Sequence, residues 1–390
     1  MKTIVFDARW IHPEPSGIGI YARELLRRLP RLAPELDFVV LFNQADVCRR
    51  TLAETDIDAL PNVRGRLFDA GIFAPRSQWR LPVELRRLGA SVYHSPNYLL
   101  PYAAFPVDRP GRTRAVTTIH DVIPFVVPDH APRSRKTRLW PLFVWCMRQS
   151  VARADAVITV SDASRRDLIR VLRLPPPRAA RIQRIYNGVD AGFSPTPGEE
   201  ATAAPCRDAA APRTLLYVGR LDPYKNVALL VRVFARLQPR FAFPLRLRIV
   251  GPPDARYPQA REAVRELGLE AAVSFEGFLD AAGLVQAYRD ATVLAHPSRY
   301  EGFGLQLLEA MRCGLPVVCT TAGAMPEVVG EAALLTPPDD ADAFLQALER
   351  VLGDPPLAER LRRAGLEQAA RFTWERTAQA TLELYRSKPA

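Results

Sequence analysis

Two cationic side chains, five positions apart, are the first group in this sequence that could do chemistry. Arg220 and Lys225 lie in the segment YVGRLDPYKN, after the apolar run Thr214–Val218 and before a helical pattern over Val227–Leu237. Open α/β sheets place their ligands at the carboxyl ends of the strands. A guanidinium and an ammonium at such an end could clamp a diphosphate. A surface turn with solvated charges would carry the same residue types.

A second group combines carboxylates with glycines in the segment HPSRYEGFGLQLLEA, which follows an apolar run ending at His296. Gly302 and Gly304 would open a helix, and the first amides of a helix form an anion site. Glu301 precedes this helix, and we expect Glu309 about two turns into it. Such carboxylates could accept hydrogen bonds from the hexose and ribose hydroxyls of a nucleotide sugar. The alternative is a solvated Glu309, but its neighbours are apolar, and a carboxylate among them needs a partner.

The first half of the chain has its own candidates. His120 ends the apolar run Ala115–His120, so it is either a ligand-facing group or a satisfied histidine at a strand end. Gly17 and Gly19 follow the first apolar run, but position 22 is Ala, so the full G-x-G-x-x-G dinucleotide motif is missing. These glycines would let the backbone approach a diphosphate or an acceptor, or they simply begin a helix.

The elements that must position these residues are short apolar runs alternating with longer helical patterns. Continuous apolar runs of this kind predict parallel strands covered on both faces. The pattern occurs twice, so we expect an α/β protein with two doubly wound, Rossmann-like domains. The expected strands are Thr3–Asp7, Phe38–Phe42, Ser91–His94, Ala115–His120 and Ala156–Val160 in the first half, and Thr214–Val218, Leu245–Val250, Val273–Glu276, Val293–His296, Pro316–Thr320 and Ala333–Leu335 in the second.

The boundary between the two domains is marked by composition. Residues 191–212 are rich in Pro, Ala and Gly without periodicity, which predicts a linker. The N-terminal domain is therefore expected over 1–190 and the C-terminal domain over 213–372. Residues 373–390 form an amphipathic helical pattern with two candidate positions: the end of the second domain, or packed back on the first.

Composition and charge exclude several classes of protein. Hydrophobic residues make up 48% and charged residues 24%, which rules out whole-chain disorder and a coiled coil. Residues 1–190 carry 30 Lys or Arg and 18 Asp or Glu, a net charge of +12, whereas residues 191–390 carry 23 and 24, or −1. The basic first half predicts an anionic partner. The 5 cysteines are scattered without CxxC spacing, which indicates a reducing compartment and no zinc site.

Several of these motifs together show a resemblance that none shows alone. The chain resembles family-4 retaining glycosyltransferases of the two-lobed GT-B fold, and most closely the mannosyltransferases that build O-antigen polysaccharide. The motifs occur in the family's order over nearly the whole chain: PSGIGIYARELL (15–26), SPNYLLP (95–101), IHDVIPFVVPDH (119–130), VSDASRRDL (160–168), YNGVD (186–190), GR…KN, EGFGLQLLE and FTWE (372–375).

The resemblance implies roles in donor binding for residues of the second half. The C-terminal domain would bind a nucleotide sugar, with Arg220 and Lys225 on the diphosphate. The amides of the segment Gly302, Phe303 and Gly304 would cap the phosphate and the sugar. Glu301 would contact the hydroxyls of the transferred sugar, and Glu309 would contact the ribose.

The resemblance also implies a role for the first half. The N-terminal domain would bind the acceptor and face the C-terminal domain across a cleft. His120 would lie over the reacting face of the donor sugar, and Asp121 would orient His120 or reach acceptor hydroxyls. Gly17 and Gly19 would lie near the diphosphate or the incoming acceptor.

The expected mechanism follows from the residues available. A double displacement needs a carboxylate under the anomeric carbon, and none stands out in the first half. We therefore expect front-face attack, in which the acceptor hydroxyl enters on the side from which the diphosphate leaves. Positive groups at Arg220, Lys225 and the helix start would stabilise the leaving diphosphate without a metal. The Asp-x-Asp sequence at Asp56–Asp58 is interpreted as surface, so we expect no metal and no cofactor.

The expected substrates are a GDP-mannose donor and a glycan or polyprenyl-diphosphate-linked acceptor of cell-surface polysaccharide synthesis. GDP-mannose rests on the subgroup likeness alone, so UDP-glucose and dTDP-rhamnose stay open. A GT-B-fold sugar-nucleotide epimerase is an alternative that product analysis would separate. A nicotinamide enzyme is disfavoured by the incomplete glycine motif. A nucleic-acid binder is disfavoured because no helix-turn-helix or RNA-binding signature is present.

The expected location is the cytoplasm, on the inner face of the plasma membrane. No apolar run approaches the roughly 20 residues of a membrane span, and the N-terminus lacks the features of a signal peptide. Residues 131–154 hold six basic and no acidic residues, with Trp140, Phe143 and Trp145 among them. Such a segment suits an anionic lipid surface. The alternative is a helix that turns Leu139, Phe143 and Met147 to the core.

Overall fold

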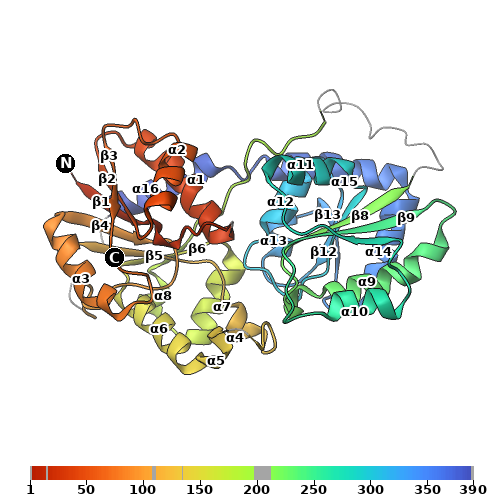
Figure 1. Ribbon diagram of the computed structural model, residues 1–390, viewed down its shortest axis with the longest axis horizontal. Helices are drawn as coiled ribbons and strands as arrows, with labels where there is room; N and C mark the ends of the chain where they lie inside the picture. Colours follow the sequence, from red (N-terminus) through yellow and green to blue (C-terminus); the bar gives the residue numbers. More distant parts are fainter. Residues whose placement is uncertain (1, 15, 108–110, 134, 197–211, 388–390) are drawn as a thin grey trace. The chain divides into compact units, whose positions relative to one another are not determined.

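The computed structural model describes residues 2–387 apart from 15, 108–110, 134 and 197–211. The chain divides into two compact units (Figure 1). The first combines Met1–Val122, Arg138–Gly188 and Trp374–Ala390, and the second combines Ile123–Thr137 and Val189–Thr373. Most of the expected linker, residues 197–211, lies outside the described residues.

The first unit is built on a seven-stranded parallel sheet with the strand order β3-β2-β1-β4-β5-β6-β7. Its strands are β1 (Thr3–Asp7), β2 (Asp37–Phe42), β3 (Val63–Leu67), β4 (Ala90–Ser95), β5 (Arg114–Ile119), β6 (Ala156–Thr159) and β7 (Ile182–Arg184). The central strand β1 is buried along its whole length, with Val5 between Val39 of β2 and Tyr93 of β4. Burial on both faces explains why this strand is a continuous apolar run.

Helices cover both faces of this first sheet. They are η1 (Ala8–Trp10), α1 (Gly17–Leu32), α2 (Ala45–Glu54), α3 (Pro75–Arg87), α6 (Trp140–Arg153), α7 (Asp162–Leu172), α8 (Pro176–Ala179) and α16 (Trp374–Arg386). The helices α1 and α2 connect strands that run from β1 toward the β3 edge of the sheet, whereas α3 and α6 connect strands that run toward the β7 edge. Because such crossovers are right-handed, the two pairs of helices lie on opposite faces of the sheet (Figure 1).

The second unit repeats the architecture with a six-stranded parallel sheet in the order β10-β9-β8-β11-β12-β13. Its strands are β8 (Arg213–Val218), β9 (Leu245–Val250), β10 (Val273–Phe275), β11 (Val293–His296), β12 (Val317–Thr320) and β13 (Ala333–Thr336). Its helices are α4 (Ile123–Val126), η2 (Pro223–Lys225), α9 (Val227–Leu237), η3 (Gln238–Arg240), α10 (Gln259–Glu266), α11 (Ala281–Asp290), α12 (Leu305–Arg312), α13 (Met325–Val329), α14 (Ala341–Gly353) and α15 (Pro355–Ala369), and α5 (Arg135–Arg138) ends where the chain returns to the first unit.

The expectation of two doubly wound α/β domains is confirmed. Every expected strand is present within a residue or two, and among the described residues the strands that the sequence missed are β3 and β7. Two segments expected in the first domain lie in the second unit. Ile123–Thr137 packs in the second unit, where the Arg133 amide donates to Tyr257 Oη. Val189 also belongs there, because it pairs with Thr373 and its amide donates to the Phe372 carbonyl.

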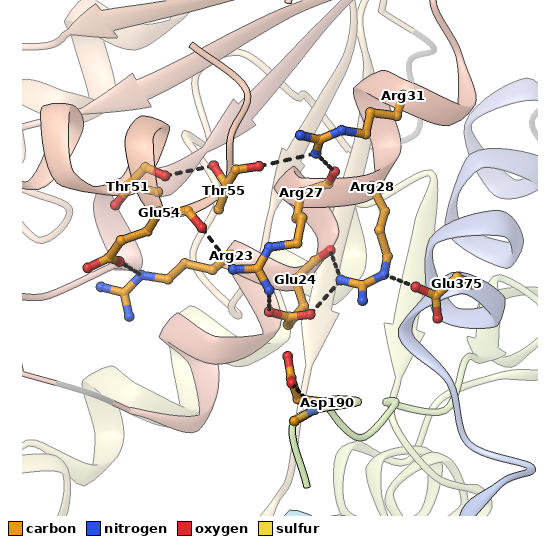
Figure 2. A network of polar contacts seen from close by, with 11 residues as sticks. Arg23, Glu24, Arg27, Arg28, Arg31, Thr51, Glu54, Thr55, Asp190 and Glu375 are labelled. Carbon is orange, nitrogen blue, oxygen red and sulfur yellow. Dashed lines mark hydrogen bonds and ion pairs between the residues drawn. The ribbon is translucent and has the colours of Figure 1, made fainter. Parts of the chain in front are cut away.

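The C-terminal helix α16 belongs to the first unit, which is the second of the two positions considered for it. It packs against α1, with Trp374 buried. Thr377 Oγ1 donates to the Tyr186 carbonyl at 2.7 Å, and Arg28 of α1 reaches Glu375 at 2.6 Å. Figure 2 shows the arginines of α1 joining this helix on one side and α2 on the other, where Arg27 donates to the Glu54 carbonyl. No helix among the described residues has the length and hydrophobicity that a bilayer crossing requires.

Candidate active site

The strongest polar cluster of the second unit lies where β8 and β11 end. Lys225 is the last residue of η2, and Asn226 then takes a positive φ of 59° to start α9. Glu301 follows β11, and its carboxylate accepts from Lys225 Nζ at 2.7 Å and 2.9 Å through its two oxygens. His296, the last residue of β11, lies 2.8 Å from Glu301 Oε1 through Nε2. The fold therefore brings together three side chains from two separate segments.

Burial and charge oppose each other in this cluster. Lys225, His296 and Glu301 are all buried. Burial by itself would raise the pKa of the Glu301 carboxyl, but the charge of Lys225 and the hydrogen bond from His296 outweigh it and lower that pKa. Burial would lower the pKa of Lys225, and the charge of Glu301 outweighs this and raises it. The pair is therefore ionised at neutral pH and holds its hydrogen bonds in a dry environment.

The backbone of Glu301 is fixed by the loop after β12. The Ala324 amide donates to the Glu301 carbonyl at 2.9 Å. A Cβ on Gly323, which has a φ of 61°, would lie 2.3 Å from the same carbonyl oxygen, so only glycine fits there. Gly302, Phe303 and Gly304 are buried and lead into α12, with Gly304 at a φ of 93° as the residue before the helix. This is the helix start that the sequence predicted, and in its first turn the Leu307 amide donates to the Gly304 carbonyl at 3.0 Å.

Glu309 lies on the same helix, closer to its start than expected. It is the fifth residue of α12, just over one turn in rather than about two. Its Oε2 accepts from the Tyr288 hydroxyl of α11 at 2.7 Å. Burial raises the pKa of the Glu309 carboxyl to about 7, although the Tyr288 hydrogen bond acts against this shift. We expected a polar partner for Glu309 because its sequence neighbours are apolar, and this partner is Tyr288 of α11.

Arg220 lies in the same loop as Lys225 but outside the buried cluster. Its guanidinium is 62% exposed and pairs with Asp222 at 2.8 Å. Its carbonyl accepts from the Tyr217 hydroxyl at 2.7 Å. The two cations predicted to act together thus differ in environment: Lys225 is buried and paired with Glu301, and Arg220 faces solvent.

The candidates of the first half form a separate group in the first unit. His120 follows β5, and its Nε2 lies 2.9 Å from the Pro96 carbonyl. A carbonyl only accepts, so Nε2 carries the hydrogen. Burial lowers the pKa of His120, which makes the neutral ring the main form, with Nδ1 as an acceptor. Tyr21 of α1 meets the ring edge to face, with centroids 4.8 Å apart. Asp121, next in the chain, is half-buried.

Gly17 and Gly19 lie at the start of a helix. Gly17 and Gly19 are the first and third residues of α1, and Ser16 Oγ accepts from the Gly19 amide at 3.1 Å. The Gly19 amide thus serves the helix cap, which is the plainer of the two interpretations given to these glycines. Tyr21 stands one turn further on, so this helix start is also tied to His120.

Two functional candidates were missed from the sequence. His296 was treated only as the end of a strand, and Tyr288 was not considered. A histidine at the carboxyl end of a buried strand, five residues before a glutamate, was the available signal for the first. A second Asp-x-Asp, Asp340–Asp342, was also overlooked. It begins α14, where Asp340 caps the Ala343 amide. The described residues hold no group of three or more His, Cys, Asp or Glu that could bind a metal ion.

Known proteins show the same combination of fold and motifs. The family described as "Glycosyltransferase Family 4" matches residues 15–193, and "Glycosyl transferases group 1" matches residues 207–368. The chain is 30% identical to the O-antigen chain mannosyltransferase B of Escherichia coli, covering 98% of this chain and 99% of that protein. It is 29% identical to the D-inositol 3-phosphate glycosyltransferase of Kribbella flavida, covering 96% and 91%. The sucrose-phosphate synthase of Thermosynechococcus elongatus superposes with a TM-score of 0.76 at 25% identity, covering 99% and 98%.

Proposed function

The chain belongs to the family-4, group 1 glycosyltransferases of GT-B fold, and from this premise we propose that it transfers mannose from GDP-mannose to a growing or lipid-linked cell-surface glycan. The mannosyl donor and the glycan acceptor are carried over from the similarity to the O-antigen mannosyltransferase. UDP- and dTDP-sugars are the alternative donors, which the sequence leaves open.

The observation that carries the proposal is the pairing of Lys225 with Glu301 beside the start of α12. A donor diphosphate needs cations and amide donors, and a hexose needs hydroxyl acceptors. Lys225 and the solvent-facing Arg220 supply the cations, the start of α12 supplies the amides, and Glu301 supplies the acceptor. Glu309, on the same helix, supplies the acceptor for the ribose.

The proposed reaction is front-face substitution with retention. The bond from the anomeric carbon to the diphosphate oxygen breaks, and the acceptor oxygen bonds to that carbon on the same face. The acceptor's proton passes to the leaving phosphate oxygen. Lys225, Arg220 and the helix start stabilise the negative charge that develops on the diphosphate. His120 and Asp121 are proposed to contact the hexose or the acceptor. Cations in these positions make a divalent metal unnecessary.

Thermal shift against GDP-, UDP-, dTDP- and CDP-sugars, with and without EDTA, is the first test. A ligand that binds only the folded protein raises its melting temperature by mass action. We expect a selective rise with GDP-mannose that EDTA leaves unchanged, followed by transfer with retained configuration in product analysis. Binding or transfer that EDTA abolishes and Mn²⁺ restores contradicts the metal-free mechanism. A larger response to another nucleotide sugar moves the proposal to that donor.

We also propose that the enzyme works at an anionic membrane surface, on its cytoplasmic side. In α6, Phe143 and Met147 are buried, but Leu142 and Trp145 are 53% and 48% exposed, and Leu139, just before the helix, is 56% exposed. The alternative prediction, that Leu139, Phe143 and Met147 all face the core, is therefore wrong for Leu139. A stripe of exposed tryptophan and leucine beside basic residues suits the lipid interface.

The helix α3 adds exposed apolar and basic side chains to the proposed membrane-binding surface. It exposes Trp79 and Val83 by 66% and 56%, with Arg76 and Arg80 on the same side of the helix. Right-handed crossovers place α3 and α6 on one face of the sheet. Flotation with phosphatidylglycerol vesicles tests this: Trp79→Ser with Trp145→Ser should reduce binding. Unchanged binding by the double variant would rule out this surface.

A further inference from the structure

The Glu301 carboxylate contacts one flexible side chain, Lys225, and one fixed side chain, His296. Its Oε1 contacts His296 Nε2 at 2.8 Å and Lys225 Nζ at 2.7 Å, whereas Oε2 contacts Lys225 Nζ at 2.9 Å. Lys225 reaches the carboxylate from the far end of a flexible four-carbon side chain. His296 is held at the end of β11, fully buried, with its ring stacked on Tyr217 at 6.1 Å and 17°.

The proposed function requires Lys225 to change its partner. The Lys225 ammonium already donates to both oxygens of Glu301. It cannot keep these hydrogen bonds and also direct all of its donors to a diphosphate. If Lys225 turns to the diphosphate, Glu301 stays buried without its cation, and an unpaired buried charge is strongly destabilising. The exchange is feasible only where other donors hold the carboxylate. The donor sugar can supply one hydroxyl to Oε2, and His296 is already on Oε1.

The form of His296 suits this role. An ionised Glu301 only accepts, so the hydrogen lies on His296 Nε2. Among the described residues, His296 Nδ1 has no hydrogen-bond partner, so a second ring hydrogen would be a buried, unsatisfied donor. Ser298 Oγ lies 3.1 Å from Nε2 on the same side as the carboxylate. The Nε2 hydrogen of His296 therefore keeps one hydrogen bond to Glu301 before and after the exchange.

We propose that His296 is a positioning residue that holds Glu301 in place while Lys225 passes from Glu301 to the donor diphosphate. The inference rests on the proposed function and adds a step to it. In the free enzyme Lys225 and Glu301 satisfy each other. In the donor complex each turns to a part of the donor, Lys225 to the diphosphate and Glu301 to the hexose, and His296 is the contact that does not change.

The exchange gives Glu301→Gln an unusual signature. This change leaves Lys225 buried without an anion in the free protein, and a diphosphate then satisfies it. We expect Glu301→Gln to bind free GDP more tightly than the wild type by about 10-fold, while kcat falls because the hexose loses its charged acceptor. Calorimetry at pH 8 and steady-state kinetics measure the two effects. Weaker GDP binding by this variant would overturn the exchange.

The role of His296 is tested by a double-mutant cycle on GDP binding. His296→Leu should weaken GDP binding by about 10- to 100-fold, since Lys225 then leaves a carboxylate with no donor. Residue 301 carries no charge in the Glu301→Gln background. There the same change at His296 should weaken GDP binding by less than about 3-fold. His296→Gln, whose amide nitrogen can take the place of Nε2, should restore most of the loss. An equal loss in both backgrounds refutes the positioning role.

Two further outcomes separate the inference from the proposed function. If His296→Leu does not fold, as judged by its melting temperature, His296→Asn replaces it, because its shorter amide does not reach Glu301. A wild-type protein that binds no nucleoside diphosphate refutes the proposed function, and this inference with it. A wild-type protein that binds GDP, with no coupling between residues 296 and 301, refutes the inference alone.

Discussion

Glu309 should make donor binding depend on pH near neutrality. Burial raises the pKa of its carboxyl to about 7, with the Tyr288 hydroxyl as its hydrogen-bond donor. Ribose hydroxyls donate to the ionised carboxylate, which accepts only, so the ionised form is the one that binds. Acidification removes that form from the free protein. The affinity for a nucleotide sugar should therefore fall as the pH is lowered through 7.

The size of this effect follows from the fraction of Glu309 that is ionised. The apparent dissociation constant equals the intrinsic one divided by the competent fraction. With a pKa of about 7, that fraction is about 0.9 at pH 8 and about 0.03 at pH 5.5. The expected loss of affinity between these values is about 30-fold, or about 2 kcal/mol.

Calorimetry with GDP-mannose from pH 5.5 to 8 measures this loss. A nucleotide sugar is the right ligand, because the terminal phosphate of free GDP has its own pKa near 6, as phosphate monoesters do. Glu309→Gln should bind more weakly at pH 8 and show a flat profile. Tyr288→Phe should move the midpoint to higher pH, because the hydrogen bond lowers the pKa of Glu309. A Glu309→Gln profile as steep as the wild type's would refute the reasoning.

The same shift has a consequence for stability with a defined sign. The pKa of Glu309 is about 7 in the folded protein and 4.5 in the reference state. Folding therefore favours the protonated carboxyl. The contribution of Glu309 to the free energy of unfolding is complete below pH 4.5 and is lost as the pH rises to 7. The loss is at most about 3 kcal/mol. Urea denaturation at pH 5 and 8 should show a smaller decline for Glu309→Gln than for the wild type.

Three further predictions concern the buried structure. Lys225→Met should lower the free energy of unfolding by about 3–5 kcal/mol and abolish donor binding, because it leaves a buried carboxylate unpaired; chemical denaturation and calorimetry measure the two losses. Gly323→Ala should lower the melting temperature far more than Gly268→Ala, since a Cβ meets the Glu301 carbonyl at 2.3 Å in the first and open space in the second. Arg9→Met should cost about 3–5 kcal/mol, because Arg9 is the buried partner of Asp7 at 2.7 Å. A loss below 1 kcal/mol in urea denaturation would contradict this.

The fold was predictable because its central strands carry their signal locally. Strands such as β1 and β11 are buried along their whole length and consist mainly of apolar residues, and the structure keeps their predicted bounds. The two missed strands lie at the edges of the first sheet, where one side of a strand has no neighbour. In β3, the sequence VRGRL is largely exposed, and in β7 the sequence IQR is only three residues long. Edge strands can hold charged side chains, so they lack the apolar run on which the prediction depended.

The site was predictable in position but not in pairing. The carboxyl ends of strands supplied Lys225, Glu301 and His120, because parallel sheets gather loops at that edge. The sequence could not show that Lys225 contacts Glu301, 76 positions away. It could not show that Glu309 faces Tyr288 either, since apolar residues on both sides of Glu309 leave its direction open. Pairings of this kind depend on how helices and loops pack against the sheet.

A buried Lys–Glu pair gains little for the fold alone. Apolar residues of similar volume in its place are often as stable or more so, because two charges must lose their water. Lys225 and Glu301 nevertheless occupy the strand ends where α/β proteins bind ligands, and the buried His296 contacts one oxygen of the carboxylate. Charges that satisfy each other cost the free protein least, and each can be transferred to a ligand group of opposite character. On the proposed function, Lys225 and Glu301 therefore form a binding site in which the two charges neutralise each other until the donor separates them.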